Sequence, residues 1–271
     1  MAVCLTGGAA GSIRAFFGKW GAVAQLGERL VRNEEVRGSI PLSSTNPERP
    51  RLRLAPLRPH RPTPAQLGLT AAEGRVLRAL RTPERIQQFI VELPANFEED
   101  GDTLYSVRRV LRHRKAHCIE AAFTAACALW LQGEPPLVMD FFAKGDADHV
   151  VALFRRDGCW GAISKSNHIW LRWRDPIYRT PRELAMSYFH EYVLKERKTL
   201  RTYSGPVDLR RFPSEQWITN EEECWDVGAA LTDVRHYPVA TPAQLRRLTR
   251  RDAMEVRADG IREYQKPERR H

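Results

Sequence analysis

Two residues in the sequence have the types and the order that thiol chemistry requires. Cys118 lies in RKAHCIEAAFTAACALWLQG, where an alanine-rich helix is expected to begin, and His149 opens the apolar run HVVALFR. The partial positive charge of a helix N terminus and a nearby imidazolium both lower the pKa of a thiol. The pair therefore predicts a nucleophile, Cys118, that attacks an acyl or amide carbonyl while His149 shuttles the proton.

A tight turn indicates which residues lie near the His149 ring. Asp157-Gly158 stands between two apolar runs, which predicts a β-hairpin with a two-residue type I′ turn. Directly opposed residues of a hairpin point to the same face, so counting back from the turn places Ser164 and Ser166 on the face of His149. This register favours Ser166 as the residue that orients the ring, and Ser164 as the next candidate.

Other orienting residues remain open. A one-residue slip of the hairpin would bring in Asn167, and Asp146 or Asp148 from the preceding loop could fold back onto the ring. A serine accepts a hydrogen bond but carries no charge that would stabilise an imidazolium. The backbone N–H of Cys118 is the expected oxyanion donor, with a partner that the sequence does not identify.

The remaining reactive side chains are expected to have structural roles. Cys127 is expected in the core of the same helix, Cys159 beside the turn, and His190 and Tyr192 in core or rim packing. Zinc ligands could in principle come from His117, Cys118, His149 and His168. These four residues lack the close spacing of a preformed half-site, and the thiol chemistry requires no metal or cofactor.

Helices are expected first along the chain and an antiparallel sheet after them, which indicates an α+β fold. The expected helices lie near residues 71–81, 83–92, 103–112, 117–131, 181–195, 221–234 and 242–255. The expected strands are 137–143, 149–155 and 159–164, with a fourth at 168–173. The segment 117–131 has almost no polar face, so it is expected to be a buried helix that packs on the sheet.

Thr-Pro pairs mark several of the expected helix starts. They occur at Thr63, Thr82, Thr180 and Thr241, where threonine is suited to the N-cap and proline to the first helical position. Glu183 and Gln244 follow the last two threonines by three residues, which predicts two capping boxes.

The chain divides into three parts. Residues 1–60 lack a sustained period and are expected to be disordered, 61–240 form the α+β domain, and 241–271 form a basic, solvated C-terminal helix and tail. The stretch VAQLGERLVRNEEVRGSIPLSST resembles the conceptual translation of a transfer-RNA gene, so the natural start is expected near residue 50. The alternative is a basic targeting presequence.

Composition restricts the class of protein. The net charge of +10 comes from arginines that are scattered among acidic residues, which predicts a solvated surface rather than a nucleic-acid interface. No apolar run reaches the ~20 residues that a membrane span needs. The five cysteines are widely spaced, which favours a reducing, cytoplasmic setting. No feature of the sequence indicates an oligomeric state.

The order of Cys118, His149 and the GCWGAIS strand resembles the transglutaminase-like superfamily, and the chain is similar to divergent bacterial members of it. The resemblance covers residues 100–175. It implies a papain-like cysteine-protease fold and an acyl-transfer or amide-hydrolysing activity on a peptide or protein, as in a peptidase, deamidase or transglutaminase. Family members usually carry Asp where this chain has Ser164, so a catalytically silent domain that binds a peptide or protein is the alternative.

Overall fold

A computed structural model describes residues 61–99 and 101–264. The expectations for residues 1–60, the transfer-RNA resemblance included, lie outside the described residues.

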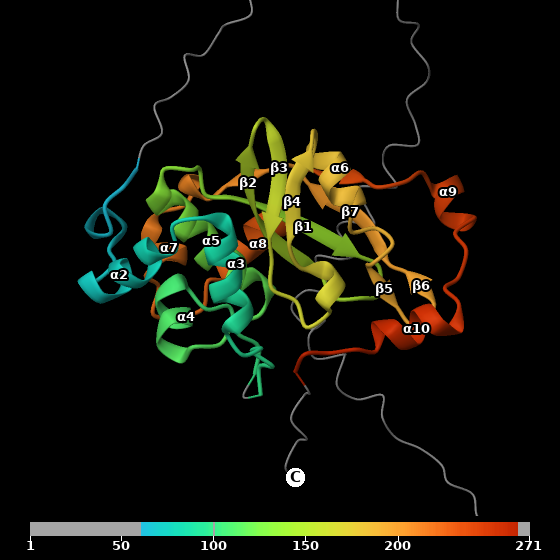
Figure 1. Ribbon diagram of the computed structural model, residues 1–271, viewed down its shortest axis with the longest axis horizontal. Coiled ribbons are helices and arrows are strands. Elements are labelled where there is room, and N and C mark those ends of the chain that lie inside the picture. The colour runs from blue at the N-terminus through green and yellow to red at the C-terminus, as the bar shows by residue number, and fades with distance from the viewer. Residues whose placement is uncertain (1–60, 100, 265–271) are drawn as a thin grey trace, which may run out of the picture. The chain divides into compact units, whose positions relative to one another are not determined.

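Helices and strands follow one another in the α+β order that the sequence predicts (Figure 1). The first helices are α2 (Ala71–Ala79), α3 (Pro83–Glu92), α4 (Val107–His113) and α5 (Cys118–Gln132). The strands β1 (Leu137–Ala143), β2 (His149–Arg156), β3 (Cys159–Ile163) and β4 (Arg174–Tyr178) come next. The rest of the described chain contains α6 (Pro181–Met186), β5 (Val193–Leu194), β6 (Arg197–Lys198), β7 (Leu200–Ser204), β8 (Val207–Asp208), α7 (Ser214–Trp217), α8 (Trp225–Asp233), β9 (His236–Pro238), α9 (Pro242–Arg246) and α10 (Ala253–Asp259).

The main sheet is antiparallel and has the strand order β4-β3-β2-β1-β7-β9, with β8 also paired to β1. The expected hairpin register is confirmed, since Arg156 pairs with Cys159 and Leu153 with Ala162. Asp157 and Gly158 have φ values of 49° and 80°, and both central residues of a type I′ turn need positive φ. The β2–β3 ladder ends at the pair Ala152–Ile163.

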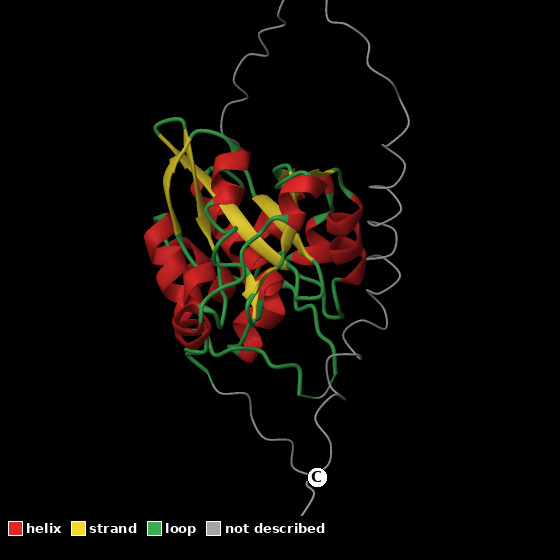
Figure 2. Cartoon of the chain, turned by 90° about the vertical axis from the view of Figure 1, so that its right-hand side faces the viewer, coloured by secondary structure: helices red, strands yellow, loops and turns green. Residues whose placement is uncertain are grey.

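Both faces of the sheet are covered, as Figure 2 shows by the strands that run between two groups of helices. Val150, Ala152 and Phe154 of β2 join the core that contains α5, while Val151 and Leu153 join a second core on the opposite face. A strand that is buried on both faces reads as a continuous apolar run, as β2 does. The expected burial of the alanine-rich helix is confirmed, because its residues from Ile119 to Leu129 are all buried.

Threonine N-caps are confirmed at three of the predicted positions. The side chains of Thr82, Thr180 and Thr241 each accept a backbone N–H in the first turn of the helix that follows. The predicted capping box is complete at Thr241. At Thr180 the box is only half formed, because the carboxylate of Glu183 accepts from the backbone N–H of Arg179.

Three expected elements are wrong. Residues 168–173 contain a 3₁₀ turn at Ile169–Leu171, and the edge strand begins only at Arg174. The helix expected over 181–195 ends at Met186, where the Ser187 hydroxyl donates to the Leu184 carbonyl and so competes with the helical ladder. The helix expected over 242–255 is divided into α9 and α10, with a new N-cap at Asp252.

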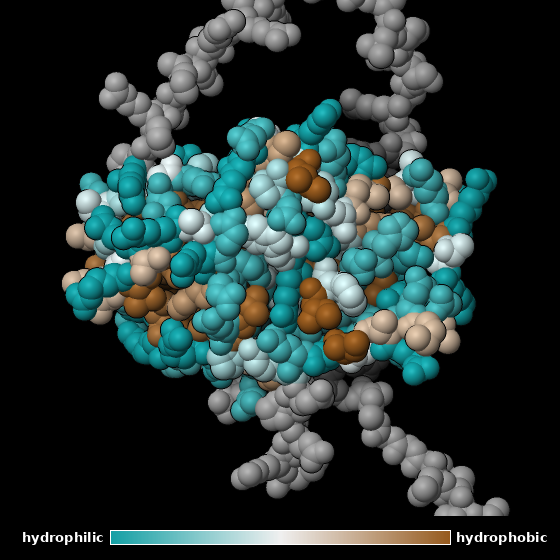
Figure 3. Space-filling model, viewed as in Figure 1, coloured by the Kyte–Doolittle hydropathy of each residue, from teal (hydrophilic) through white to brown (hydrophobic). Residues whose placement is uncertain are grey.

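The surface shown in Figure 3 is mostly hydrophilic, with hydrophobic side chains in separate patches. Among the described residues, no helix has the length and apolar character needed to span a membrane.

Gly161 is expected to be a stability-determining position of the hairpin. A Cβ at this residue would lie 2.4 Å from Phe154 Cζ and 3.0 Å from the Arg174 carbonyl oxygen. Because overpacking of this kind costs about 1–3 kcal/mol, Gly161→Ala is expected to lower the free energy of unfolding by that amount in urea titrations. Gly205→Ala is the control, since the nearest atom to its Cβ would be 3.8 Å away; equal losses for the two variants would contradict the explanation.

Candidate active site

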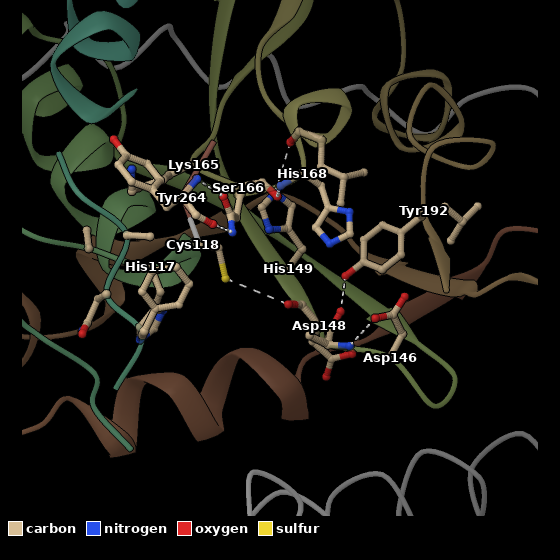
Figure 4. A pocket seen from close by; sticks show the side chains of 18 residues that line it. His117, Cys118, Asp146, Asp148, His149, Lys165, Ser166, His168, Tyr192 and Tyr264 are labelled. Carbon is tan, nitrogen blue, oxygen red and sulfur yellow. Dashed lines mark hydrogen bonds between the residues drawn. The ribbon is translucent and has the colours of Figure 1, made fainter. Parts of the chain in front are cut away.

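A pocket of about 260 Å³ lies at the N terminus of α5 and is lined by both Cys118 and His149 (Figure 4). His149 is the first residue of β2, so the start of this strand and the start of the helix meet at the pocket. The segment 165–168 forms another wall. Tyr192 and Tyr264, which lie far from the hairpin in sequence, complete it.

Cys118 is partly exposed, whereas the His149 side chain is buried. The sulfur of Cys118 lies 3.9 Å from the Asp148 carbonyl oxygen. Burial alone raises the pKa of the thiol, but hydrogen bonding and charge from the imidazoles of His117 and His149 outweigh burial and lower the pKa to about 5. The position at the first turn of a helix acts in the same direction.

Hydrogen bonds to Nε2 determine the tautomer of His149. Its Nε2 lies 2.6 Å from Ser164 Oγ and 3.3 Å from the Leu171 carbonyl oxygen. The Ser164 hydroxyl donates its own proton to the same carbonyl at 3.0 Å, so its oxygen is an acceptor toward the ring. Nε2 therefore carries the proton, and Nδ1 is left to exchange a proton with a substrate or with the thiol.

Ser164, not Ser166, contacts the His149 ring, which corrects the order of preference drawn from the register. The hairpin ladder ends at Ile163, and Gln87 of α3 then binds both the N–H and the carbonyl of Ser164, each at 2.9 Å. The pairing of β2 with β3 therefore ends before Ser166, and the hairpin register does not determine where Ser166 points. Its hydroxyl instead accepts the backbone N–H of His168 at 3.0 Å.

The other candidates for the orienting role have different partners. Asp146 Oδ2 accepts from Thr199 Oγ1 at 2.8 Å, and Asp148 Oδ1 accepts from the Ala143 N–H at 2.9 Å. Asn167 hydrogen-bonds to the backbone of Tyr264. All three residues line the pocket without orienting the ring.

A second imidazole beside Cys118 was not identified from the sequence as part of the site. His117 Nε2 lies 3.0 Å from the Thr103 carbonyl oxygen and 3.3 Å from Glu120 Oε1. Burial lowers the pKa of His117, but the Glu120 charge outweighs burial and raises it well above the ordinary value. His117 is therefore an imidazolium at neutral pH, and it stabilises negative charge on the adjacent sulfur.

Glu120 is a fully buried carboxylate whose oxygens accept several hydrogen bonds. The donors are the backbone N–H groups of Tyr105 (2.9 Å) and His117 (2.8 Å), Thr103 Oγ1 (3.0 Å) and Asn96 Nδ2 (3.2 Å). Burial raises its pKa, but the His117 charge and these donors lower it to about 2. The signal in the sequence is the i,i+3 spacing of His117 and Glu120 at a helix start.

Two further carboxylates lie close to the pocket. Burial and the negative charges of Asp140 and Cys118 raise the pKa of Asp148. Asp140 itself pairs with His236 at 3.1 Å.

Two buried cysteines, Cys127 and Cys224, differ from Cys118. Burial raises the pKa of Cys127 far above the ordinary range and that of Cys224 to about 12. Cys127 lies in the core, as the sequence predicts.

The two serines provide a direct test of the geometry. Ser164→Ala removes the acceptor that holds Nε2–H, so the ring turns more freely and the pH midpoint of Cys118 alkylation is expected to rise by a fraction of a unit to one unit. Ser166→Ala, which removes a neighbouring hydroxyl bonded to His168, is expected to leave the midpoint unchanged. Peptide-resolved mass spectrometry measures both variants. A larger shift for Ser166→Ala would reverse the assignment.

Among residues 61–99 and 101–264, no three or more His, Cys, Asp and Glu side chains form a group that could hold a metal ion. No protein-family model matches the chain, and no curated protein is significantly similar to it.

Proposed function

We propose that the protein is a cysteine-dependent enzyme with a transglutaminase-like, papain-like fold that transfers or hydrolyses acyl groups of peptides or proteins. The observation that carries the proposal is a thiol with a pKa of about 5 at a helix N terminus, next to a histidine whose Nε2–H is held by Ser164. The described cysteines are free thiols, which supports a reducing, cytoplasmic setting.

The proposed reaction has two halves. The Cys118 thiolate attacks the carbonyl carbon, a C–S bond forms, and the oxyanion is stabilised by the backbone N–H of Cys118 at the start of α5. The Cys118 thiol has given its proton to His149 Nδ1, so when the tetrahedral intermediate collapses and the C–N bond breaks, the amine leaves with that proton. Water or a second amine then attacks the thioester, gives its proton to His149 Nδ1 and releases Cys118.

The two imidazoles have different roles in this proposal. His117 is paired with the ionised Glu120, which holds its proton and leaves it unable to cycle at neutral pH. The Nε2–H of His149 meets only the neutral oxygens of Ser164 and Leu171, so its other nitrogen can gain and lose a proton. His149 is therefore the general acid and base, and His117 an electrostatic stabiliser.

A catalytically silent domain that binds a peptide or protein is the second candidate function. The observation that favours it is Ser164, a neutral group in the position where the resembled family places a carboxylate. Serine orients the ring but contributes little to the stability of an imidazolium.

Acylation of Cys118 distinguishes the cysteine-dependent enzyme from the catalytically silent binding domain. An activated ester is expected to acylate Cys118 once per chain, as intact-mass and peptide mass spectrometry would show. His149→Ala is expected to lose turnover of the thioester at every pH. Acylation of Cys118 is expected to be slow at pH 6 in His117→Gln and to recover as the pH rises, because this variant changes only the fraction of Cys118 that is thiolate. A folded wild-type protein that never acylates at Cys118 leaves the binding module as the function.

A further inference from the structure

Residues 260–264, which follow α10, return to the Cys118 pocket. Arg262 forms an antiparallel β-bridge with His168 on the segment that follows the hairpin. Ile261 and Glu263 are exposed while Arg262 and Tyr264 are half-buried. The chain bends after this bridge, and Tyr264 becomes part of the pocket lining.

Asn167 binds the backbone of Tyr264 at two points. Its Nδ2 donates to the Tyr264 carbonyl oxygen, and its Oδ1 accepts the Tyr264 N–H, both at 2.9 Å. The side-chain amide uses one N–H donor and its oxygen acceptor on the C=O and N–H of a single residue. This contact recognises peptide backbone whatever its side chains are.

The Tyr264 side chain occupies a subsite with defined chemistry (Figure 4). Its hydroxyl lies 3.2 Å from the Leu93 carbonyl oxygen and 3.3 Å from that of Val91. Lys165, which is 4% exposed, places its Nζ 5.2 Å from the ring centroid, within the range of a cation–π contact. The subsite therefore suits an aromatic ring that carries a hydroxyl group.

Glu263, the residue before Tyr264, has a charged partner, and His168 is held to the last residue of α10. Glu263 pairs with Arg172, a residue whose Nε is fixed to the Ser166 carbonyl oxygen at 2.8 Å. His168 pairs with Asp259 at 3.3 Å. An acidic residue before the tyrosine therefore has a cationic partner, Arg172, next to the pocket residue Leu171.

We propose that Lys165–His168 is the peptide-binding subsite of the Cys118 pocket, that its ligands are peptides with an acidic residue followed by tyrosine, and that residues Arg262–Tyr264 occupy it as an intramolecular competitor. As the substrate class of an enzyme this rests on the proposed function, but the binding itself does not. The β-bridge at His168 and the Asn167 side chain supply contacts to the peptide backbone, and the Tyr264 subsite supplies the selectivity.

A tethered segment competes at an effective concentration of about millimolar, so the wild-type chain is expected to bind free peptide weakly. The probe is a fluorescent peptide with the sequence DGIREYQK, residues 259–266, and the readout is anisotropy with full-length protein that carries Cys118→Ser. Tyr264→Ala empties the aromatic subsite and is expected to tighten peptide binding at least tenfold relative to the same chain with Tyr264. Adding Asn167→Ala is expected to reverse that gain.

A peptide in which alanine replaces the tyrosine is the matched control and is expected to bind at least tenfold more weakly to the Tyr264→Ala chain. Equal binding of the two peptides, or no gain from Tyr264→Ala in a folded chain, would show that residues 262–264 are only a structural anchor. If Tyr264→Ala fails to fold, Tyr264→Phe removes the hydroxyl alone and is expected to give a gain of about two- to fivefold; no gain would overturn the proposal.

Because Cys118 is replaced by serine in this assay, its failure is distinct from failure of the proposed function. Peptide binding without acylation at Cys118 would support the subsite and contradict the enzyme. Acylation without peptide binding would do the reverse.

Discussion

Glu120→Ala is expected to lower the free energy of unfolding by about 3–5 kcal/mol, the usual cost of breaking a buried ion pair by removing one partner. The variant leaves the His117 imidazolium without its counter-charge. It also removes the acceptor for the backbone N–H groups of Tyr105 and His117 and for Asn96. Urea titration followed by circular dichroism measures the loss.

Glu120→Gln separates charge from shape, because it keeps the volume and one acceptor oxygen. Its free energy of unfolding is expected to lie between those of wild type and Glu120→Ala. Glu221→Ala is the surface control, since Glu221 pairs with Arg112 at 2.6 Å but is more than half exposed. A surface ion pair of this kind contributes little to the free energy of unfolding. A loss for Glu221→Ala as large as that for Glu120→Ala would contradict the importance of burial.

The Glu120–His117 pair also predicts how stability depends on pH. The pKa of Glu120 is about 2 in the folded chain and about 4.5 in its ordinary state, so its contribution is complete above pH 4.5 and is lost as the pH falls toward 2. The pKa of His117 is raised, so its contribution is complete below about pH 6.5 and is lost as the pH rises toward the folded value. In Glu120→Gln, acid unfolding between pH 4.5 and 2 is expected to be less steep.

His149→Ala is expected to raise the pH midpoint of Cys118 alkylation by about two units, the size of shift that one nearby charge produces. The wild-type midpoint is expected near pH 5. His117 remains beside the sulfur in the variant, so the midpoint stays below that of a free cysteine, which is about 8.5. The midpoint is the proper readout, because a thiolate becomes more nucleophilic as its pKa rises and this offsets changes in rate.

Peptide mass spectrometry is needed for this measurement, since Cys159 is also partly exposed. His168→Ala is the matched control: His168 lines the same pocket, but its ring pairs with Asp259. The midpoint for His168→Ala is expected to equal that of wild type. An unchanged midpoint in His149→Ala would remove His149 from the site.

The sequence predicts the elements that bring the pair together, because strong local signals specify them. The Asp157-Gly158 turn determines the register of β2 and β3, and the lack of a polar face indicates the burial of α5. The turn and the buried helix both depend on residues that are close in sequence. The sequence therefore also predicts where α5 and β2 begin, and these are the positions of Cys118 and His149.

The rest of the site depends on contacts between distant segments. The choice of Ser164 over Ser166 is made by Gln87, which lies 77 positions away and takes the backbone of Ser164 out of the ladder. Tyr264 reaches the pocket through Asn167, 97 positions away, although the C-terminal residues read as a solvated tail. Periodicity and spacing carry no information about such pairs.

The ionisation of Cys118 is measured most directly by its thiolate ultraviolet absorbance, taken as the difference between wild type and Cys118→Ser across pH. One thiolate per chain with a midpoint near pH 5 is the predicted result. A thiol that ionises only above pH 8, like a free cysteine, would contradict the assignment of Cys118 as an activated nucleophile.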